Sequence, residues 1–156
     1  MNGPRHLRPS LQPGRRRGGF TLVEICITVV IIAILSGMAA PMYVRSIEQG
    51  HLDMAAGTLK NICSAQRVYW LSNKTFSDDL QTLKSLELLD ESVPAAASGT
   101  CKYTYSVTLA DETTFEIVAT RVNSTVWSGG VTITEEGGIT GSISNTSGTT
   151  LNPTTE

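Results

Sequence analysis

Residues 20–44 read FTLVEICITVVIIAILSGMAAPMYV, and Glu24 is the single charged residue among these 25. A helix of this length, rising about 1.5 Å per residue, is roughly 37 Å long, and the hydrocarbon core of a bilayer is about 30 Å thick. The sequence therefore predicts a membrane-spanning helix over residues 20–44.

The segment before this run is basic. Residues 1–19, MNGPRHLRPSLQPGRRRGG, contain five arginines and no acidic residue. Positive charge on this side and a polar remainder on the other predict a cytoplasmic N-terminus, with residues 45–156 on the opposite side of the membrane. A secretory signal places its small cleavage residues after the apolar run, whereas Gly18 and Gly19 come before it. We therefore interpret residues 1–19 (the leader) as a processing or targeting segment, and cleavage at Gly18-Gly19 would remove its charges and keep the apolar helix.

The overall composition excludes several classes of protein. The chain has 156 residues, a mean hydropathy of +0.01 and a net charge of -2, with 12 basic and 14 acidic residues. The length suits one domain, and no basic excess points to nucleic acid. Because the leader carries +5, residues 20–156 carry -7, since -2 minus +5 is -7. The three cysteines stand alone, with no C-x-x-C pair, and there are two histidines, so a zinc site is not expected.

The residues at the start of the apolar run carry a family resemblance. The stretch GFTLVE at residues 19–24, between a basic leader and an apolar run, closely resembles the prepilin motif of type IV pilins and type II secretion pseudopilins. The resemblance is strong over residues 14 to about 50 and general beyond. It implies that prepilin peptidase, a membrane aspartyl protease, cuts between Gly19 and Phe20 and methylates Phe20. The implied partners are other pilin subunits, identical or different, and an inner-membrane pilus or type II secretion assembly machinery.

Glu24 needs a reason to lie in an apolar segment. A carboxylate at the centre of a membrane helix costs roughly 2.5 to 3.5 kcal/mol on insertion scales. It can reach the interface or its own helix N-terminus, where anions are favoured, or it can pair with an amine in an assembly. In the resembled family, the glutamate at this spacing attracts the N-terminal amine of a neighbouring subunit. We therefore expect Glu24 to act in subunit assembly.

A proline interrupts the helical pattern near the end of the run. Pro41 cannot donate a hydrogen bond to the carbonyl of Gly37, so this pair predicts a kink or a locally unwound stretch. Proline and glycine are also generally commoner in membrane helices, which leaves a neutral explanation open.

Beyond residue 44 the sequence predicts a head of mixed helix and strand. Apolar residues recur every three or four positions from Leu52 to Trp70, so the helix is expected to continue to about Leu71, with Glu48, Asp53, Lys60 and Arg67 off the apolar face. A short helix is expected after a Ser77 cap, with Asp78 and Asp79 in its first turn and Leu80, Leu83 and Leu86 on its apolar edge. Alternating residues predict strands at 102–109, 115–122 and 130–134.

These elements predict an α+β, pilin-like fold in which a long N-terminal helix packs on a small antiparallel sheet. The expected divisions are a leader at 1–19, a membrane and assembly helix at 20–44, a periplasmic head at 45–136 and a Gly/Ser/Thr-rich tail at 137–156. In that tail, Ile139 and Ile143 suggest one more strand, and the end is expected to be a flexible surface.

Two of the three cysteines are candidates for a disulfide. Cys63 lies on the apolar stripe of the helix and Cys101 precedes the first strand, both in the extracytoplasmic region where disulfides persist. A bridge between them would tie the sheet to the helix, and two separately buried thiols are the alternative. Cys26 is expected to be a small apolar residue of the membrane helix.

No catalytic constellation is visible, and neither a cofactor nor a metal is expected. Once the leader is removed, His51 is the one remaining histidine, and the adjacent acidic pairs are typical of solvated loops. The sequence thus favours a non-enzymatic structural subunit of a type IV pilus or similar filament. A type II secretion pseudopilin is one alternative, and a single-pass anchored binding domain that never polymerises is another.

Overall fold

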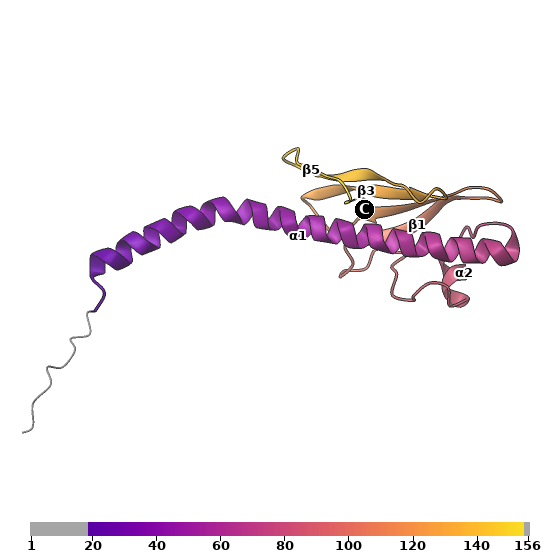
Figure 1. The fold of residues 1–156 in the computed structure, drawn as a ribbon, viewed down its shortest axis with the longest axis horizontal. Coiled ribbons are helices and arrows are strands. Elements are labelled where there is room, and N and C mark those ends of the chain that lie inside the picture. The colour runs from indigo at the N-terminus through magenta and orange to yellow at the C-terminus, as the bar shows by residue number, and fades with distance from the viewer. Residues whose placement is uncertain (1–18, 155–156) are drawn as a thin grey trace, which may run out of the picture. The chain divides into compact units, whose positions relative to one another are not determined.

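The computed structural model describes residues 19–154, and the predicted leader up to Gly18 lies outside them. Two compact units divide the chain between Ala40 and Pro41. The elements, shown in Figure 1, are α1 (Leu22–Asn73), α2 (Leu80–Ser85), β1 (Tyr103–Ala110), β2 (Phe115–Arg121), β3 (Trp127–Thr134), β4 (Ile139–Asn145) and β5 (Thr150–Leu151). The predicted long helix and the three predicted strands are confirmed, and β3 begins three residues earlier than expected.

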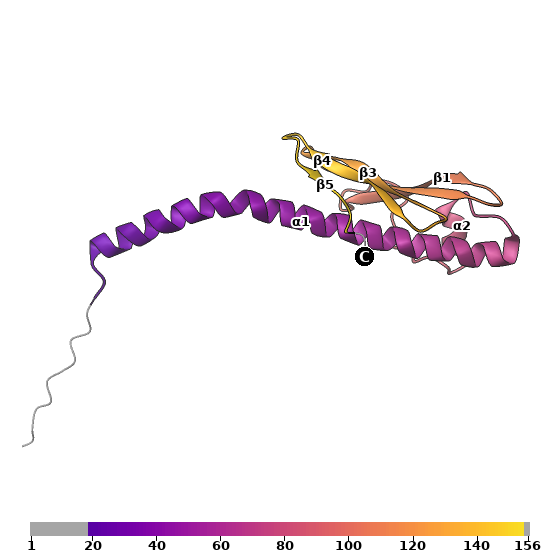
Figure 2. The same ribbon diagram turned by 45° about the horizontal axis from the view of Figure 1, so that its top comes forward.

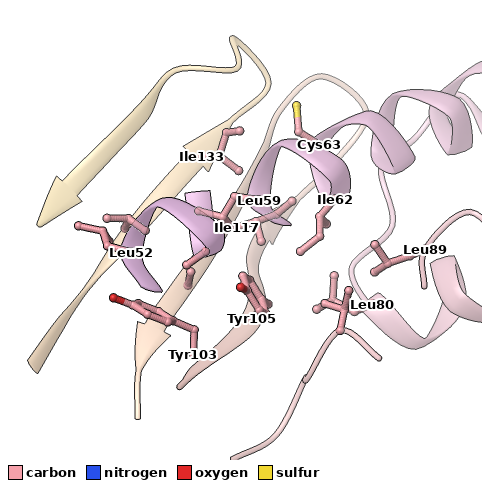
Figure 3. Close-up of a cluster of buried hydrophobic side chains, with 14 of the residues drawn as sticks. Leu52, Leu59, Ile62, Cys63, Leu80, Leu89, Tyr103, Tyr105, Ile117 and Ile133 are labelled. Carbon is pink, nitrogen blue, oxygen red and sulfur yellow. The ribbon is translucent and has the colours of Figure 1, made fainter. Parts of the chain in front are cut away.

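The second half of α1 buries one side against the sheet. Its buried residues recur at helical spacing from residue 48 to residue 66, and they are Glu48, Leu52, Ala55, Ala56, Leu59, Ile62, Cys63, Ala65 and Gln66. Figure 3 shows Leu59 and Ile62 lying over Tyr105 and Ile117 of the sheet. The helix ends where Lys74 adopts a left-handed conformation with φ of 60°, and its amide donates to the Trp70 carbonyl at 2.8 Å.

The five strands form one antiparallel sheet in the order β1-β2-β3-β4-β5. Figure 2 shows the second half of α1 along one face of this sheet. Successive side chains of β2 point to opposite faces of the sheet, so that Phe115, Ile117 and Ala119 are buried while Thr120 is exposed. The α+β, pilin-like fold class is therefore confirmed.

The short helix α2 begins later than predicted. Its N-cap is Asp79, whose carboxylate accepts a hydrogen bond from the Gln81 amide at 3.0 Å, so Asp79 does not lie within the first turn. Ser77 instead accepts from the Asp79 amide and donates to the Asp79 carbonyl, forming the turn before the helix. Leu80 and Leu83 are buried as expected, whereas Leu86 at the C-cap is 52% exposed.

The expectation of a flexible end to the tail is wrong. Residues 139–151 supply β4 and β5, and Leu151 is buried. The last described residues lie across α1, where Gln49 donates to the Asn152 carbonyl at 2.9 Å and Asp53 accepts from the Thr154 amide at 3.0 Å. The strand expected through Ile139 and Ile143 is confirmed as β4, whereas the Gly/Ser/Thr composition hid β5, because small polar residues suit the exposed face of a sheet as well as a loop.

Candidate functional site

The N-terminal end of α1 is capped by a residue that the sequence analysis did not single out. Gly19 and Phe20 precede the helix and are exposed. The hydroxyl oxygen of Thr21 accepts a hydrogen bond from the Glu24 amide at 3.2 Å, and the Ile25 amide donates to the Thr21 carbonyl at 3.2 Å. Thr-x-x-Glu is the capping-box pattern, and this pattern in the sequence could have identified Thr21.

Glu24 lies at the third position of the helix, where the exposed amides carry partial positive charge. Among residues 19–154 its carboxylate forms no ion pair. The amide of Glu24 is used by the cap, while its carboxylate remains available to a group outside the chain. This arrangement suits an acceptor for a cation.

None of the helical residues 22–40 is buried within the first compact unit. The large apolar side chains between residues 20 and 40 are 49% to 80% exposed. The helix is long enough and apolar enough to cross a membrane. A contiguous apolar surface of this size is stable only when lipid or other apolar surfaces cover it.

The predicted kink residues lie within a helix that is assigned without a break. Both Gly37 and Pro41 fall inside α1, and a side chain added at Gly37 would meet no atom within 4 Å. Gly37 is therefore not required by packing within this chain. The kink at Gly37 and Pro41 stays a prediction.

A buried ion pair joins α1 to the sheet, and the sequence analysis missed it. Glu48, predicted to lie off the buried face, is 6% exposed. The guanidinium of Arg121 on β2 donates to both of its carboxylate oxygens, from Nε at 2.5 Å and from Nη2 at 3.2 Å. Arg121 also donates to the Lys102 carbonyl at 3.0 Å and to the Val122 carbonyl. A two-pronged contact of this kind fixes both position and orientation.

Two further polar side chains, Tyr103 and His51, lie next to the Glu48–Arg121 pair. Burial, and then the Glu48 carboxylate, raise the pKa of Tyr103, whose ring lies 5.7 Å from the Arg121 guanidinium carbon. The Nδ1 atom of His51 lies 3.7 Å from a carboxylate oxygen of Glu48. Neither the Tyr103 hydroxyl nor His51 Nδ1 has a hydrogen-bond partner among the described residues.

The predicted disulfide is absent from the structure, where Cys26, Cys63 and Cys101 are all free thiols. Cys63 is buried in the core, and this burial raises its pKa. Cys101 belongs to a turn that begins at Ser98, whose amide donates a hydrogen bond to the Cys101 sulfur at 3.1 Å. Within residues 19–154, no three His, Cys, Asp or Glu side chains form a group that could hold a metal ion.

Comparisons with known proteins agree with this geometry. Residues 14–40 match the family described as "Prokaryotic N-terminal methylation motif". The chain carries a prepilin-type N-terminal motif. The matched residues include Gly19, Phe20 and Glu24.

Three characterised relatives extend the likeness into the head. The chain is 35% identical over 72 residues to the type II secretion system core protein G of Pseudomonas aeruginosa, covering 46% of this chain and 51% of the relative. It is 32% identical over 75 residues to the protein of the same name from Pectobacterium carotovorum, covering 48% of each. It is 27% identical over 113 residues to the type IV wide pilus major component PilA4 of Thermus thermophilus, covering 72% of this chain and 80% of the relative.

The match thus spans about half of each core protein G and most of the pilus component. The resemblance to type IV pilins and type II secretion pseudopilins is confirmed. The prepilin-type motif coincides with the capped helix end and with the Glu24 carboxylate, which has no ion pair within residues 19–154.

Proposed function

We propose that this chain is a structural subunit of a type IV pilus or pilus-like filament. The observation that carries the proposal is a prepilin-type motif at the start of a helix whose first half is apolar and exposed on all sides. The chain is made as a prepilin, and prepilin peptidase cuts it between Gly19 and Phe20 and methylates Phe20. Residues 20–44 then hold the subunit in the inner membrane, with the N-terminus cytoplasmic and the head periplasmic.

Polymerisation follows from the chemistry of the helix start. Cleavage creates an amine at Phe20, four residues before Glu24. Within an apolar assembly this cation and the Glu24 carboxylate of the neighbouring subunit both lose water, and each offsets the other's desolvation cost by pairing. Apolar side chains slide past one another with little preference, so the charge pair fixes the axial register between helices. Thr21 supports this role because its cap satisfies the Glu24 amide and leaves the carboxylate uncommitted.

A type II secretion pseudopilin is the second candidate. It is favoured by the two relatives named core protein G, at 35% and 32% identity, against 27% for the pilus component. The pilus assignment is favoured by the length of the match, since that alignment continues through most of the head. Both candidates share cleavage, methylation and assembly through the apolar helix, and differ in the filament that is built.

Mass spectrometry of the mature chain tests the processing step. We expect an N-terminal peptide that begins at N-methylated Phe20. A chain that retains Met1 would contradict the proposal and favour an anchored domain that never polymerises.

The assembly step is tested with a Glu24→Ala variant. We expect this variant to be cut normally but to be lost from sheared filaments, whereas the matched surface variant Glu112→Ala assembles as the parent does. Normal incorporation of Glu24→Ala would refute charge pairing. Electron microscopy of the filaments, on the cell surface or confined to the periplasm, separates pilus from pseudopilus.

A further inference from the structure

A groove of about 500 Å³ lies at the end of the head that follows the apolar run. Its walls come from α1, from the start of β3 and from the β4–β5 turn. The lining residues are Pro41, Met42, Val44, Arg45, Val126, Trp127, Asn145, Ser147 and Thr149. All of them belong to the second compact unit.

The charge of the groove is positive, whereas the net charge of residues 20–156 is negative. Arg45 is the one charged residue in the lining, although residues 20–156 carry a net charge of -7. Its side chain is exposed and forms no ion pair or hydrogen bond to any residue of 19–154. An unpaired guanidinium in a groove free of acidic residues favours an anion, and its planar donor fork matches a phosphate.

The remaining lining is amphipathic. Met42, Val44 and Val126 expose 74%, 56% and 48% of their surface, so an apolar chain could lie on them. Ser147 and Thr149 donate their amides to the Asn145 side chain, and their hydroxyls make no hydrogen bond within the described part of the chain. The groove therefore offers hydroxyl donors and a cation together with apolar contact.

The position of Arg45 along the helix points to the membrane surface. A hydrocarbon core of about 30 Å takes about 20 residues, which places its far edge near Ala39 when the span begins at Phe20. Arg45 then lies about 9 Å beyond this edge, where its side chain can reach the headgroup layer. Trp127, which lines the groove and is 6% exposed, can report on a molecule bound there.

We propose that this groove binds the phosphate headgroup of an anionic phospholipid, with its acyl chain against Met42, Val44 and Val126. Arg45 and the hydroxyls of Ser147 and Thr149 hold the phosphodiester. The inference rests on the proposed function in one respect, namely that residues 20–44 are inserted in a membrane. A subunit held in this way waits before assembly with its head fixed close to the bilayer, and leaving the membrane requires release of the lipid.

Lipid-specific quenching of Trp127 tests the proposal. The mature full-length chain carrying Trp70→Phe, which leaves Trp127 as its one tryptophan, is reconstituted in bilayers of equal parts phosphatidylcholine and phosphatidylglycerol. One of the two lipids carries brominated acyl chains in each sample. We expect brominated phosphatidylglycerol to quench about fivefold more strongly, which is the preference that one basic residue gives at an anionic surface.

Two matched variants decide what causes the preference. Arg45→Gln should abolish it, whereas Lys102→Gln, which removes an equal charge from a surface outside the groove, should retain it. Equal quenching by the two lipids in the parent would overturn the proposal, as would loss of the preference when inorganic phosphate competes. Absence of quenching by either lipid would show that no acyl chain lies near Trp127 and would also overturn the proposal, whereas a chain that fails to float with the vesicles is not inserted and would count against the proposed function itself.

Discussion

Removing the charge of Glu48 should unfold the head at much lower denaturant concentration. In the variant Glu48→Gln, the amide keeps the shape of the side chain but no longer neutralises Arg121, whose side chain is 4% exposed. The guanidinium would keep its hydrogen bonds to the Lys102 and Val122 carbonyls and lose its counter-ion. A buried cation would then lack a negative partner in the core.

The size of the effect follows from this geometry. Removing one partner of a buried ion pair typically costs 3 to 5 kcal/mol, and the two carbonyl contacts place this case near the lower end, at about 3 kcal/mol. With a urea dependence of roughly 1.5 kcal/mol per molar, the unfolding midpoint should fall by about 2 M. Replacing both residues by leucine removes both charges at once and should change stability by less than about 1 kcal/mol.

Urea titration of the full chain in detergent micelles, followed by the fluorescence of Trp70 and Trp127, measures these changes. The matched control is Glu112→Gln, which removes the same charge from an exposed loop and should shift stability by less than about 0.5 kcal/mol. A loss below about 1 kcal/mol in Glu48→Gln would refute the assignment of this pair as an anchor between α1 and the sheet.

Three further variants test local features. The Asp111 carboxylate accepts four hydrogen bonds from Thr113 and Thr114, and these bonds lower its pKa from 3.8 to about 2. Because the pKa of Asp111 is lower in the folded state, the turn is stabilised above pH 3.8 and loses this stabilisation as the pH falls through about 2. The NMR chemical shift of the Thr113 amide should therefore titrate near pH 2 in the parent. In Asp111→Asn this titration should be absent. Gly141 has φ of 97°, and an added Cβ would lie 2.5 Å from the Gly130 carbonyl oxygen. Gly141→Ala should therefore cost at least about 2 kcal/mol in urea unfolding, and an equal loss in Gly138→Ala, where the surrounding space is open, would contradict this reason. Thr21→Ala should lose about 1 kcal/mol from the first turn of α1, seen as faster amide exchange at Glu24, while Thr21→Ser keeps the protection.

The periodicity of the sequence predicted the elements in which apolar residues recur at a regular spacing. The apolar stripe of α1 has the helical repeat from Leu52 to Gln66, and both β1 and β2 begin with alternating buried residues, so all three were placed within two residues. The alternation is interrupted in β3 and β4 by Gly129 and Gly141, which are exposed and lie so close to the backbone of the neighbouring strand that a side chain would not fit. A run of small residues of this kind looks the same as a loop until the pairing strand is known.

The residues of the candidate site also differ in whether a local sequence pattern identifies them. Gly19, Phe20 and Glu24 form one short motif and could be found from the sequence alone. Glu48 and Arg121 are 73 residues apart, and each is an ordinary surface residue by its own neighbours. Their pairing depends on how β2 lies across α1, which no local pattern encodes.

If the chain assembles as proposed, the position of this pair on the helix affects how the filament responds to tension. Glu48 is the first buried residue of α1, so it marks the point at which a helix exposed on all sides becomes one covered by the head. The hydrogen bonds of Gln49 to Asn152 and of Asp53 to Thr154 lie within the next two turns. If neighbouring subunits hold residues 20–40, any pull on the head reaches these polar contacts before it reaches the apolar core at Leu59 and Ile62. Ion pairs and hydrogen bonds are directional and break over short distances, so this end of the head should yield first, and Glu48→Gln should weaken filaments under tension even where it leaves their assembly intact.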